Sequence, residues 1–174
     1  LSRLLMDGFV TGKLGEVTLV PGRPALAAEK LLGVAKRDAE ALAKERDTAE
    51  KEHLMRAFGL AVDERIPTNL RPQFKDLEEN QKRRNTRALR DGIDRIFTDA
   101  ESFFRDVISL QLQANAELTN EDLIDELNLR VYGTSVDDNI AVLDAITEAR
   151  KRLASNVRDL LVLESLCTRM ILRQ

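Results

Sequence analysis

The feature that most constrains the fold is a run of apolar residues between positions 89 and 110. Consecutive members are alternately four and three residues apart, which places their side chains on one face of an α-helix. The members are Leu89, Ile93, Ile96, Ala100, Phe103, Val107 and Leu110. This spacing predicts the buried face of one long helix, which we expect to extend from about Gln73 to Asn115.

A second long helix is predicted before it. Pro24 suits the first position of a helix, and Gly59 suits the residue just after its end. Between them only Gly33 disfavours helix, and the only apolar side chains between positions 43 and 53 are alanines. Prolines in the following loop turn the chain back. We therefore expect the two long helices to pair as a hairpin with a polar tip.

Three shorter helices are predicted in the remaining residues. The candidate N-terminal caps are Thr119 for the first helix, Thr134 or Ser135 for the second and Asn156 for the last. In the second helix the residues expected to face inward are Ile140, Leu143, Ile146, Ala149 and Leu153. The last helix is apolar around nearly its whole circumference, so we expect it to be buried in the core or against another subunit.

These patterns together predict an all-α protein, a helical bundle with a long two-helix hairpin arm. We expect a leader of uncertain structure at residues 1–23, the helical hairpin at 24–115 and a three-helix remainder at 116–174. The leader segment LGEVTLVPGRP alternates weakly and is compatible with one short strand or hairpin.

Composition limits the function classes. Hydrophobic residues make up 43% of the chain, enough for a core, and 30 acidic against 27 basic residues give a net charge of −3. Any attraction to nucleic acid must therefore be local. The single cysteine, Cys167, excludes an internal disulfide and fits a reducing setting. Because neither a membrane-spanning run nor a signal peptide pattern is found, and the chain opens on Leu1, we expect a cytoplasmic piece of a longer protein.

No pattern predicts catalysis, a cofactor or a metal site. GFVTGKL at residues 8–14 resembles a phosphate-binding loop, but three residues separate its glycines where four are needed, and a leucine replaces the magnesium-binding hydroxyl. His53 has no second histidine or thiol at metal-ligand spacing. Cys167 lies in the most apolar helix, where packing is expected rather than a reactive thiolate. Adjacent acids at 78–79 and at 137–138 point to different sides of a helix.

Residues 82–90, KRRNTRALR, carry only basic charges. The cations are Lys82, Arg83, Arg84, Arg87 and Arg90. Arg83, Arg87 and Arg90 are spaced by four and three, so they form a stripe on one helix face that suits phosphates or an acidic partner. No aromatic residue is interleaved for base stacking. Three interpretations stay open, namely a solvated face or pairing with the acid-rich first helix, contact with a partner protein, and contact with DNA.

Two blocks on the second long helix carry a resemblance to a known family. They are LEENQKRRNTRALRDGID at Leu77–Asp94 and SFFRDVI at Ser102–Ile108. This region closely resembles the C-terminal region of the delta prime type of clamp-loader subunit in bacterial DNA polymerase III. The charged helix at Ala35–Gly59 looks like the long helix of the same subunit type, and Leu153–Ile171 is similar to the final helix of clamp-loader subunits. The resemblance covers about residues 30–172.

The resemblance implies a collar domain, the helical region that holds five subunits together while they load a ring-shaped sliding clamp onto primed DNA. It implies partners among the other clamp-loader subunits, of the gamma/tau and delta types, with the clamp and the primed DNA reached only through the complex. Subunits of the delta prime type do not hydrolyse ATP, but lend an arginine to a neighbour's ATP site from a Ser-Arg-Cys segment. This chain contains no such segment, so we expect no enzyme activity in it.

Contact with neighbouring subunits is expected through the last two predicted helices. The candidate residues are Ile140, Leu143, Leu160, Leu161, Leu163, Leu166 and Met170. The rival hypothesis is a helical nucleic-acid-binding module that acts through the basic stripe of residues 82–90 and binds with steep salt dependence. A helical adaptor outside replication is a third interpretation.

Overall fold

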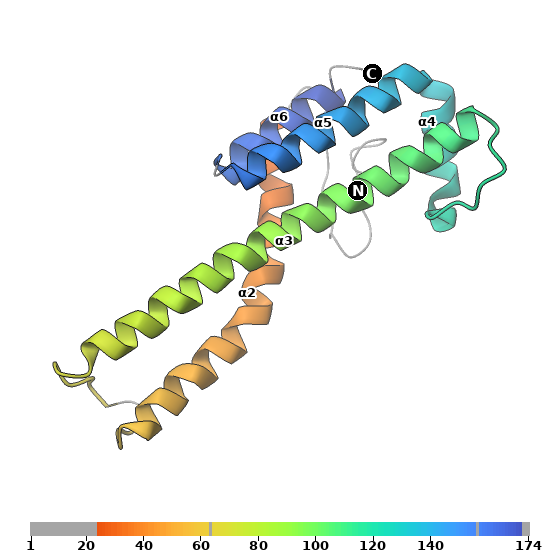
Figure 1. The fold of residues 1–174 in the computed structure, drawn as a ribbon. Coiled ribbons are helices and arrows are strands. Elements are labelled where there is room, and N and C mark those ends of the chain that lie inside the picture. The colour runs from red at the N-terminus through yellow and green to blue at the C-terminus, as the bar shows by residue number, and fades with distance from the viewer. Residues whose placement is uncertain (1–23, 63, 156, 172–174) are drawn as a thin grey trace. The chain divides into compact units, whose positions relative to one another are not determined.

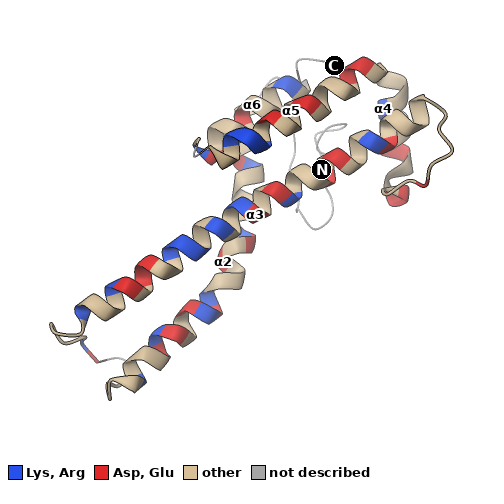
Figure 2. Cartoon of the chain, in the orientation of Figure 1, with Lys and Arg blue, Asp and Glu red and all other residues tan. Residues whose placement is uncertain are grey.

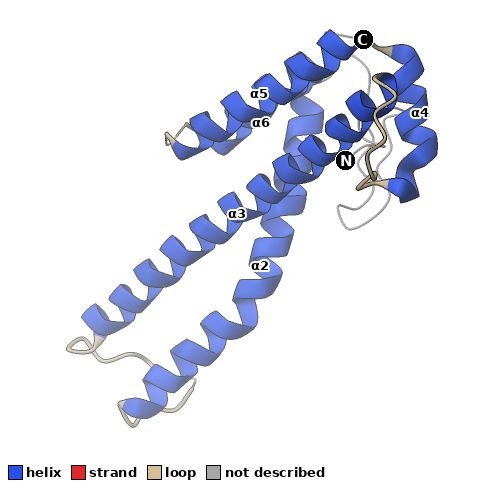
Figure 3. Ribbon diagram, turned by 45° about the vertical axis from the view of Figure 1, so that its right-hand side comes forward, coloured by secondary structure: helices blue, strands red, loops and turns tan. Residues whose placement is uncertain are grey.

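The computed structural model describes residues 24–62, 64–155 and 157–171, and every regular element in these ranges is helical (Figures 1 and 3). The α-helices are α2 (Pro24–Ala57), α3 (Arg71–Gln111), α4 (Ile124–Gly133), α5 (Val136–Ala154) and α6 (Asp159–Ile171), and a 3-10 turn, η1 (Glu121–Leu123), precedes α4. The prediction of an all-α helical bundle is confirmed. The leader predicted at residues 1–23 lies outside the described residues.

The chain divides into two compact units. Among the described residues, unit 1 comprises 24–34 and 93–171, and unit 2 comprises Ala35–Gly92. Helices α2 and α3 each contribute residues to both units. The long hairpin arm expected from the sequence stays a prediction.

Unit 1 is built around the apolar face of α3. Five of the seven seam residues are buried, and the two end members, Leu89 and Leu110, are half-buried. Phe97 and Phe104 add a second buried row, and the ring of Phe104 meets that of Phe103 edge-on, with 5.5 Å between centroids. Burying each large apolar side chain stabilises the fold by roughly 1.5–3 kcal/mol. The predicted buried face of α3 is confirmed.

Helices α5 and α6 lie side by side in unit 1 and supply more of its core (Figure 1). Helix α4 adds Leu127, and the first turns of α2 add Ala27, Ala28 and Leu31. The buried apolar residues of α5 and α6 are Val142, Ala145, Ile146, Ala149, Leu153, Val162, Leu163, Leu166, Cys167 and Met170. Unit 1 thus has a continuous apolar interior drawn from five helices.

Of the two residues predicted to cap α5, Ser135 is the cap. Its Oγ accepts from the Asp138 backbone N–H at 3.2 Å, and the Asp138 carboxylate accepts from the Ser135 backbone N–H at 3.1 Å. The two residues satisfy each other's backbone donors as a capping box. The cap predicted at Asn156 lies outside the described residues.

The cap predicted at Thr119 is wrong. The 3-10 turn begins after Asn120, whose side chain makes no capping hydrogen bond. The backbone N–H groups of Thr119 and Asn120 donate instead to buried Asp106 Oδ2, at 3.0 and 2.8 Å, and the Asn120 side-chain amide donates to the same oxygen at 2.7 Å. A carboxylate of α3 therefore fastens this loop where the sequence predicted a local cap.

The inward face of α5 differs from the predicted one only in its first two turns, since Ile146, Ala149 and Leu153 are buried as predicted. Ile140 was expected inside but is 43% exposed, and Leu143 is only half-buried, whereas Asn139 and Val142 are buried. The Asn139 side-chain amide donates to Gln111 Oε1 at 3.0 Å, which satisfies it inside the unit. Because successive residues are about 100° apart around a helix, an inward Asn139 turns Ile140 toward the surface.

Helix α2 ends as predicted, at a glycine. Gly59 has φ of 72°, a left-handed conformation that glycine adopts without strain. The Gly59 N–H donates to the Arg56 carbonyl and the Leu60 N–H to the Met55 carbonyl, both at 3.0 Å. These two bonds close the helix end as a Schellman motif.

Helix α3 ends earlier than the predicted Asn115. Gln113 takes the left-handed conformation with φ of 54°. Its N–H donates to the Leu110 carbonyl at 3.1 Å, and the Ala114 N–H donates to the Ser109 carbonyl at 2.9 Å. A glutamine occupies the position that glycine usually takes, so no residue type signals the helix end here.

Unit 2 has a narrow interior. Its buried alanines on α2 are Ala35, Ala39 and Ala43. A side chain added at Gly92 of α3 would place its Cβ 3.5 Å from the Cβ of Ala35, so the two helices approach closely there. Toward the loop that joins them, Met55 and Phe74 are buried, and the rings of Phe58 and Phe74 are 6.4 Å apart.

Candidate docking and anion-binding surfaces

The seven predicted docking residues fall into two groups. Three are buried in this chain's own interior, namely Leu163, Leu166 and Met170. Four reach the surface at least in part, namely Ile140, Leu143, Leu160 and Leu161. A side chain buried in its own unit has no area left for a partner, so the candidate docking surface reduces to the second group. Within that group Leu161 is 51% exposed.

Unit 1 exposes other large apolar side chains that the sequence patterns did not single out. They are Leu112, Ile124, Leu129 and Tyr132, and Tyr132 is 88% exposed. Leu123, Leu127 and Val131 recur every four residues along η1 and α4 and so predict an inward stripe, and of these Leu127 is buried. Leu129 and Tyr132 lie off that stripe on another face of the same helix. The sequence signal that could have identified these exposed residues was therefore the presence of apolar residues outside the periodic stripe.

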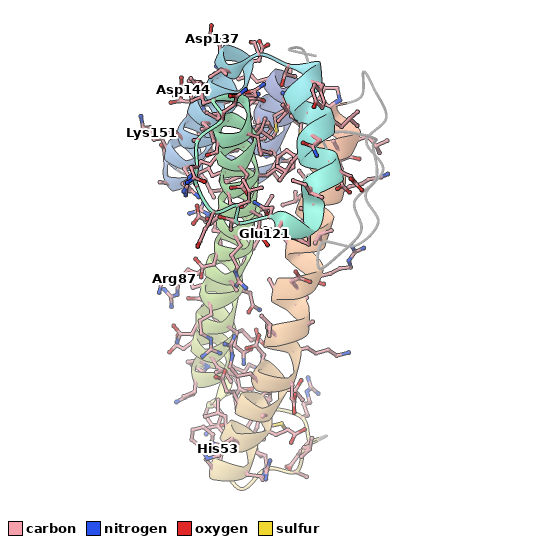
Figure 4. The ribbon with its side chains drawn as sticks, turned by 90° about the vertical axis from the view of Figure 1, so that its right-hand side faces the viewer. His53, Arg87, Glu121, Asp137, Asp144 and Lys151 are labelled. Atoms are coloured by element: carbon pink, nitrogen blue, oxygen red, sulfur yellow. The ribbon has the colours of Figure 1, made fainter. Side chains whose placement is uncertain are left out.

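Helix α5 also carries exposed charged residues. Asp137, Asp144 and Lys151 are exposed and project from the outer side of α5 (Figure 4). Apolar side chains with a charged border are typical of the surfaces that proteins use to bind other proteins.

Arg150 has an internal role in unit 1. Its Nε donates to Asp94 Oδ1 at 2.5 Å, its Nη1 to Glu101 Oε1 at 2.7 Å and its Nη2 to Thr98 Oγ1 at 2.9 Å. The hydrogen bond to Glu101 is the main cause that raises the pKa of Arg150, with that to Asp94 adding to it. The guanidinium therefore ties α5 to α3.

Arg130 is a buried cation between α4 and α5. Its Nε donates to Asn139 Oδ1 at 3.1 Å, and its guanidinium carbon lies 5.4 Å from the centroid of the Phe104 ring. Burial lowers the pKa of Arg130, and the charge of Asp138 opposes that shift. The Nε hydrogen bond and the ring face offset part of the cost of burying this cation, whereas its Nη2 is buried without a hydrogen-bond partner.

The cations of residues 82–90, in unit 2, do not all have the same role, and Arg84 has a structural one. The Arg84 Nη2 donates to Asp47 Oδ1 of α2 at 3.2 Å and also bonds the carboxylate of Glu50. The hydrogen bond with Arg84 is the main cause that lowers the pKa of Glu50, and the same bond raises the pKa of Arg84. The side-chain amides of Gln81 and Asn85 also donate to oxygens of Asp47 and Glu50 on α2, at 3.0–3.1 Å. Pairing with the acid-rich first helix is therefore confirmed for Arg84.

The other cations of the stretch differ from Arg84. Lys82, Arg83 and Arg87 are exposed, and Arg90 is half-buried. The Arg83 Nη2 donates to the neutral Asn80 Oδ1 at 3.0 Å. Arg87 points away from α2 (Figure 4), and Figure 2 shows the blue run along this part of α3.

Two side chains with reactive potential are those of His53 and Cys167. His53 lies exposed near the end of α2 and lines an open groove with Glu50 and Asp76 (Figure 4). Cys167 is buried, and burial raises its pKa to about 12, so its thiol stays protonated at neutral pH. Among the described residues, no group of three or more His, Cys, Asp or Glu side chains is placed to hold a metal ion.

Comparison with protein-family models gave no match, and searches among curated proteins and among solved structures gave none either. Over residues 24–62, 64–155 and 157–171, no helix combines the length and the apolar character needed to cross a bilayer. What the chain does is therefore inferred from its own residues and surfaces.

Proposed function

We propose that this chain is the non-catalytic oligomerisation domain, or collar, of a DNA polymerase III clamp-loader subunit of the delta prime type. In this role it holds the heteropentamer that loads the sliding clamp during DNA replication in the cytoplasm. The resemblance of Leu77–Asp94 and Ser102–Ile108 to that subunit type supports the family, as the similarity of Leu153–Ile171 to the final clamp-loader helix also does.

The observation that carries the docking role is the outer face of α5 and α6. Ile140 and Leu161 remain large, apolar and about half exposed on helices whose inner faces already form the core of unit 1. Leu143, three residues after Ile140, and Leu160, next to Leu161, add half-buried apolar area. Protein interfaces are built from such apolar centres with a charged rim, and α5 carries the rim residues Asp137 and Asp144.

The partners under this proposal are the other clamp-loader subunits, of the gamma/tau and delta types. ATP hydrolysis is assigned to those subunits. The sliding clamp and the primed DNA are reached only through the assembled complex.

The test is light scattering on a sizing column, first with this chain alone and then with the collar regions of the other subunits. We expect a defined hetero-oligomer. The double variant Ile140→Asp with Leu161→Asp should remain folded and fail to assemble, because two charges would be placed in an apolar interface. Leu42→Asp is the matched control, since Leu42 is 71% exposed in unit 2 and should leave assembly unchanged.

Two outcomes would contradict the proposal. One is a chain that stays alone in every mixture that contains complete partner subunits. The other is assembly that survives the double variant but is lost with Leu42→Asp, since docking would then lie in unit 2.

A further inference from the structure

We propose that the exposed cations of residues 82–90 form a surface that binds the phosphate backbone of duplex DNA without reading its base sequence. The surface lies in unit 2 and consists of Lys82, Arg83 and Arg87. It is separate from the docking face of unit 1 and does not depend on the collar role.

The first support is that two acids of α2, Asp47 and Glu50, are already engaged by a different arginine. Asp47 and Glu50 bind Arg84, and Gln81 also donates to Glu50 at 3.1 Å. These carboxylates thus lie on the side of α3 that faces α2, whereas Arg87 points away from α2 (Figure 4). The outward side of the stretch keeps its positive charge.

The second support is the chemical character of what surrounds the cations. Within residues 82–90 the other side chains are Asn85, Thr86, Ala88 and Leu89, and none of them is a large exposed hydrophobic group. Protein interfaces depend on buried aromatic and apolar anchors. Binding to a phosphate backbone needs no such anchor, because its affinity comes from charge neutralisation and the release of counterions. A polyanionic backbone therefore fits this surface better than an acidic protein does.

The third support concerns the form of the nucleic acid. Residues 75–96 contain no aromatic side chain, and the nearest ones, Phe74 and Phe97, are both buried. Proteins that hold single strands combine positive charge with exposed aromatic rings on which bases stack. A helix face with arginines but no exposed ring is suited to the regular backbone of a duplex.

Flanking acids limit the size of the surface. Glu78 and Glu79 are exposed before it and Asp91 after it, so the positive run spans nine residues, or about 13 Å of helix. Three neutralised phosphates give an expected salt slope of about −2.7 in log–log form. Affinity should therefore fall about 40-fold when salt rises from 50 to 200 mM, since the concentration changes fourfold.

The experiment measures fluorescence anisotropy of labelled 20-base-pair duplexes of two unrelated sequences, titrated with the 174-residue chain at several salt concentrations. We expect equal binding to both sequences with the slope given above. Arg83→Gln with Arg87→Gln should weaken binding and reduce the slope to about −0.9. Glutamine is a good helix former, so the helix should be retained.

The matched control is Lys44→Gln with Lys51→Gln, which removes the same charge from two exposed positions of α2 in the same unit. It should leave both the affinity and the slope unchanged. Arg83→Lys with Arg87→Lys keeps the charge and should keep the slope, which guards against a folding defect in the glutamine variant.

Four results would overturn the proposal. They are absence of binding at 50 mM salt, equal losses in the glutamine variant and in its control, tighter binding to single strands than to duplexes, and equally effective binding of poly-glutamate, which would indicate an acidic protein partner. The collar proposal is tested separately, since the Arg83 and Arg87 variants should assemble normally with the other subunits in light scattering.

Discussion

The two units of this chain are stabilised in different ways. Unit 1 buries phenylalanine, leucine and isoleucine side chains from several helices, with Phe97 and Phe103 fully enclosed. Between the buried alanines and the Met55–Phe74 end of unit 2, a polar layer joins α2 to α3, in which Arg84 binds Asp47 and Glu50. The same two helices therefore pass from a polar pairing in one unit to an apolar core in the other.

The difference shows what each unit can tolerate. Apolar burial contributes in proportion to area, so the interior of unit 1 carries most of the free energy of unfolding. Ion pairs that remain open to water are screened and contribute little each. Unit 2 is thus expected to open locally at a lower free energy than unit 1.

The residues that the two units expose to solvent also differ. Unit 1, with the apolar interior, also presents apolar residues such as Leu161 and Tyr132 to solvent. Unit 2, with the polar pairing, presents the cations Arg83 and Arg87. The two proposals made above follow this division, with docking assigned to the first unit and the phosphate surface to the second.

The largest expected effect is in the core of unit 1. Phe97→Ala should lower the free energy of unfolding by about 3–5 kcal/mol, because it removes a fully buried ring and leaves a cavity. Urea denaturation followed by circular dichroism measures the change. Leu42→Ala in unit 2 is the control and should stay within about 0.5 kcal/mol, since Leu42 is mostly exposed. A loss in Phe97→Ala no larger than that in Leu42→Ala would mean that burial of the Phe97 ring does not stabilise unit 1.

A smaller effect is expected at the buried carboxylate of unit 1. Asp106→Ala should cost about 2–3 kcal/mol, since the N–H groups of Thr119 and Asn120 would lose a charged acceptor. Asp106→Asn keeps one carbonyl oxygen and should cost less. Amide exchange of Thr119 and Asn120 reports the same change locally. No change in exchange at those two amides would show that the loop is held by other contacts.

Features of this fold that depend on neighbouring residues could be predicted from the sequence, because one local rule decides each of them. The seam from Ile93 to Val107 followed from the 3.6-residue period, and the end of α2 followed from the conformational freedom of Gly59. The chemistry of helix caps reduced the cap of α5 to Thr134 or Ser135, and the structure shows that it is Ser135.

Two of the failed predictions involve contacts between residues distant in the sequence, whereas the early end of α3 comes from the local left-handed conformation of Gln113. Thr119 does not cap because Asp106, thirteen residues away, takes its N–H. Ile140 turns outward because Asn139 bonds Gln111, which lies on α3. For the docking surface, burial of Leu163 depends on which side of α6 meets its neighbours, and a helix that is apolar on every side does not specify that side.

The ends of the two long helices offer a smaller test, one in each unit. Gln113→Gly should raise the free energy of unfolding by about 0.5–1 kcal/mol, because glycine adopts the left-handed conformation at less cost than glutamine. Gly59→Ala should have the opposite sign, by about 1 kcal/mol, for the same reason. Thermal denaturation of both variants measures the pair. A destabilising Gln113→Gly would mean that the glutamine side chain contributes more than its backbone strain costs.

The smallest expected effect is the acid response of unit 2. The pKa of Glu50 is lowered from its ordinary value of 4.5, mainly by the hydrogen bond from Arg84. A carboxyl group whose pKa is lower in the folded state stabilises that state above the unfolded pKa, and this contribution is lost as the pH falls through the folded value. The protection factors of amides in unit 2, which compare the measured exchange with the intrinsic rate at each pH, should therefore fall below about pH 4.5, and Glu50→Gln should remove part of that pH dependence.

The interpretation of the Glu50 result depends on how far the Glu50–Arg84 ion pair is exposed to water. Because the side chains of Arg84 and Glu50 are partly exposed, at 39% and 30%, raising the salt concentration should weaken the Glu50–Arg84 bond and reduce the difference between Glu50→Gln and the unaltered chain. The Asp106 variants serve as the comparison, since a buried carboxylate is screened much less. If salt left the Glu50 difference unchanged while it altered the Asp106 difference, unit 2 would have the better protected polar contact. The contrast between an apolar and a polar unit would then have to be reversed for these two carboxylates.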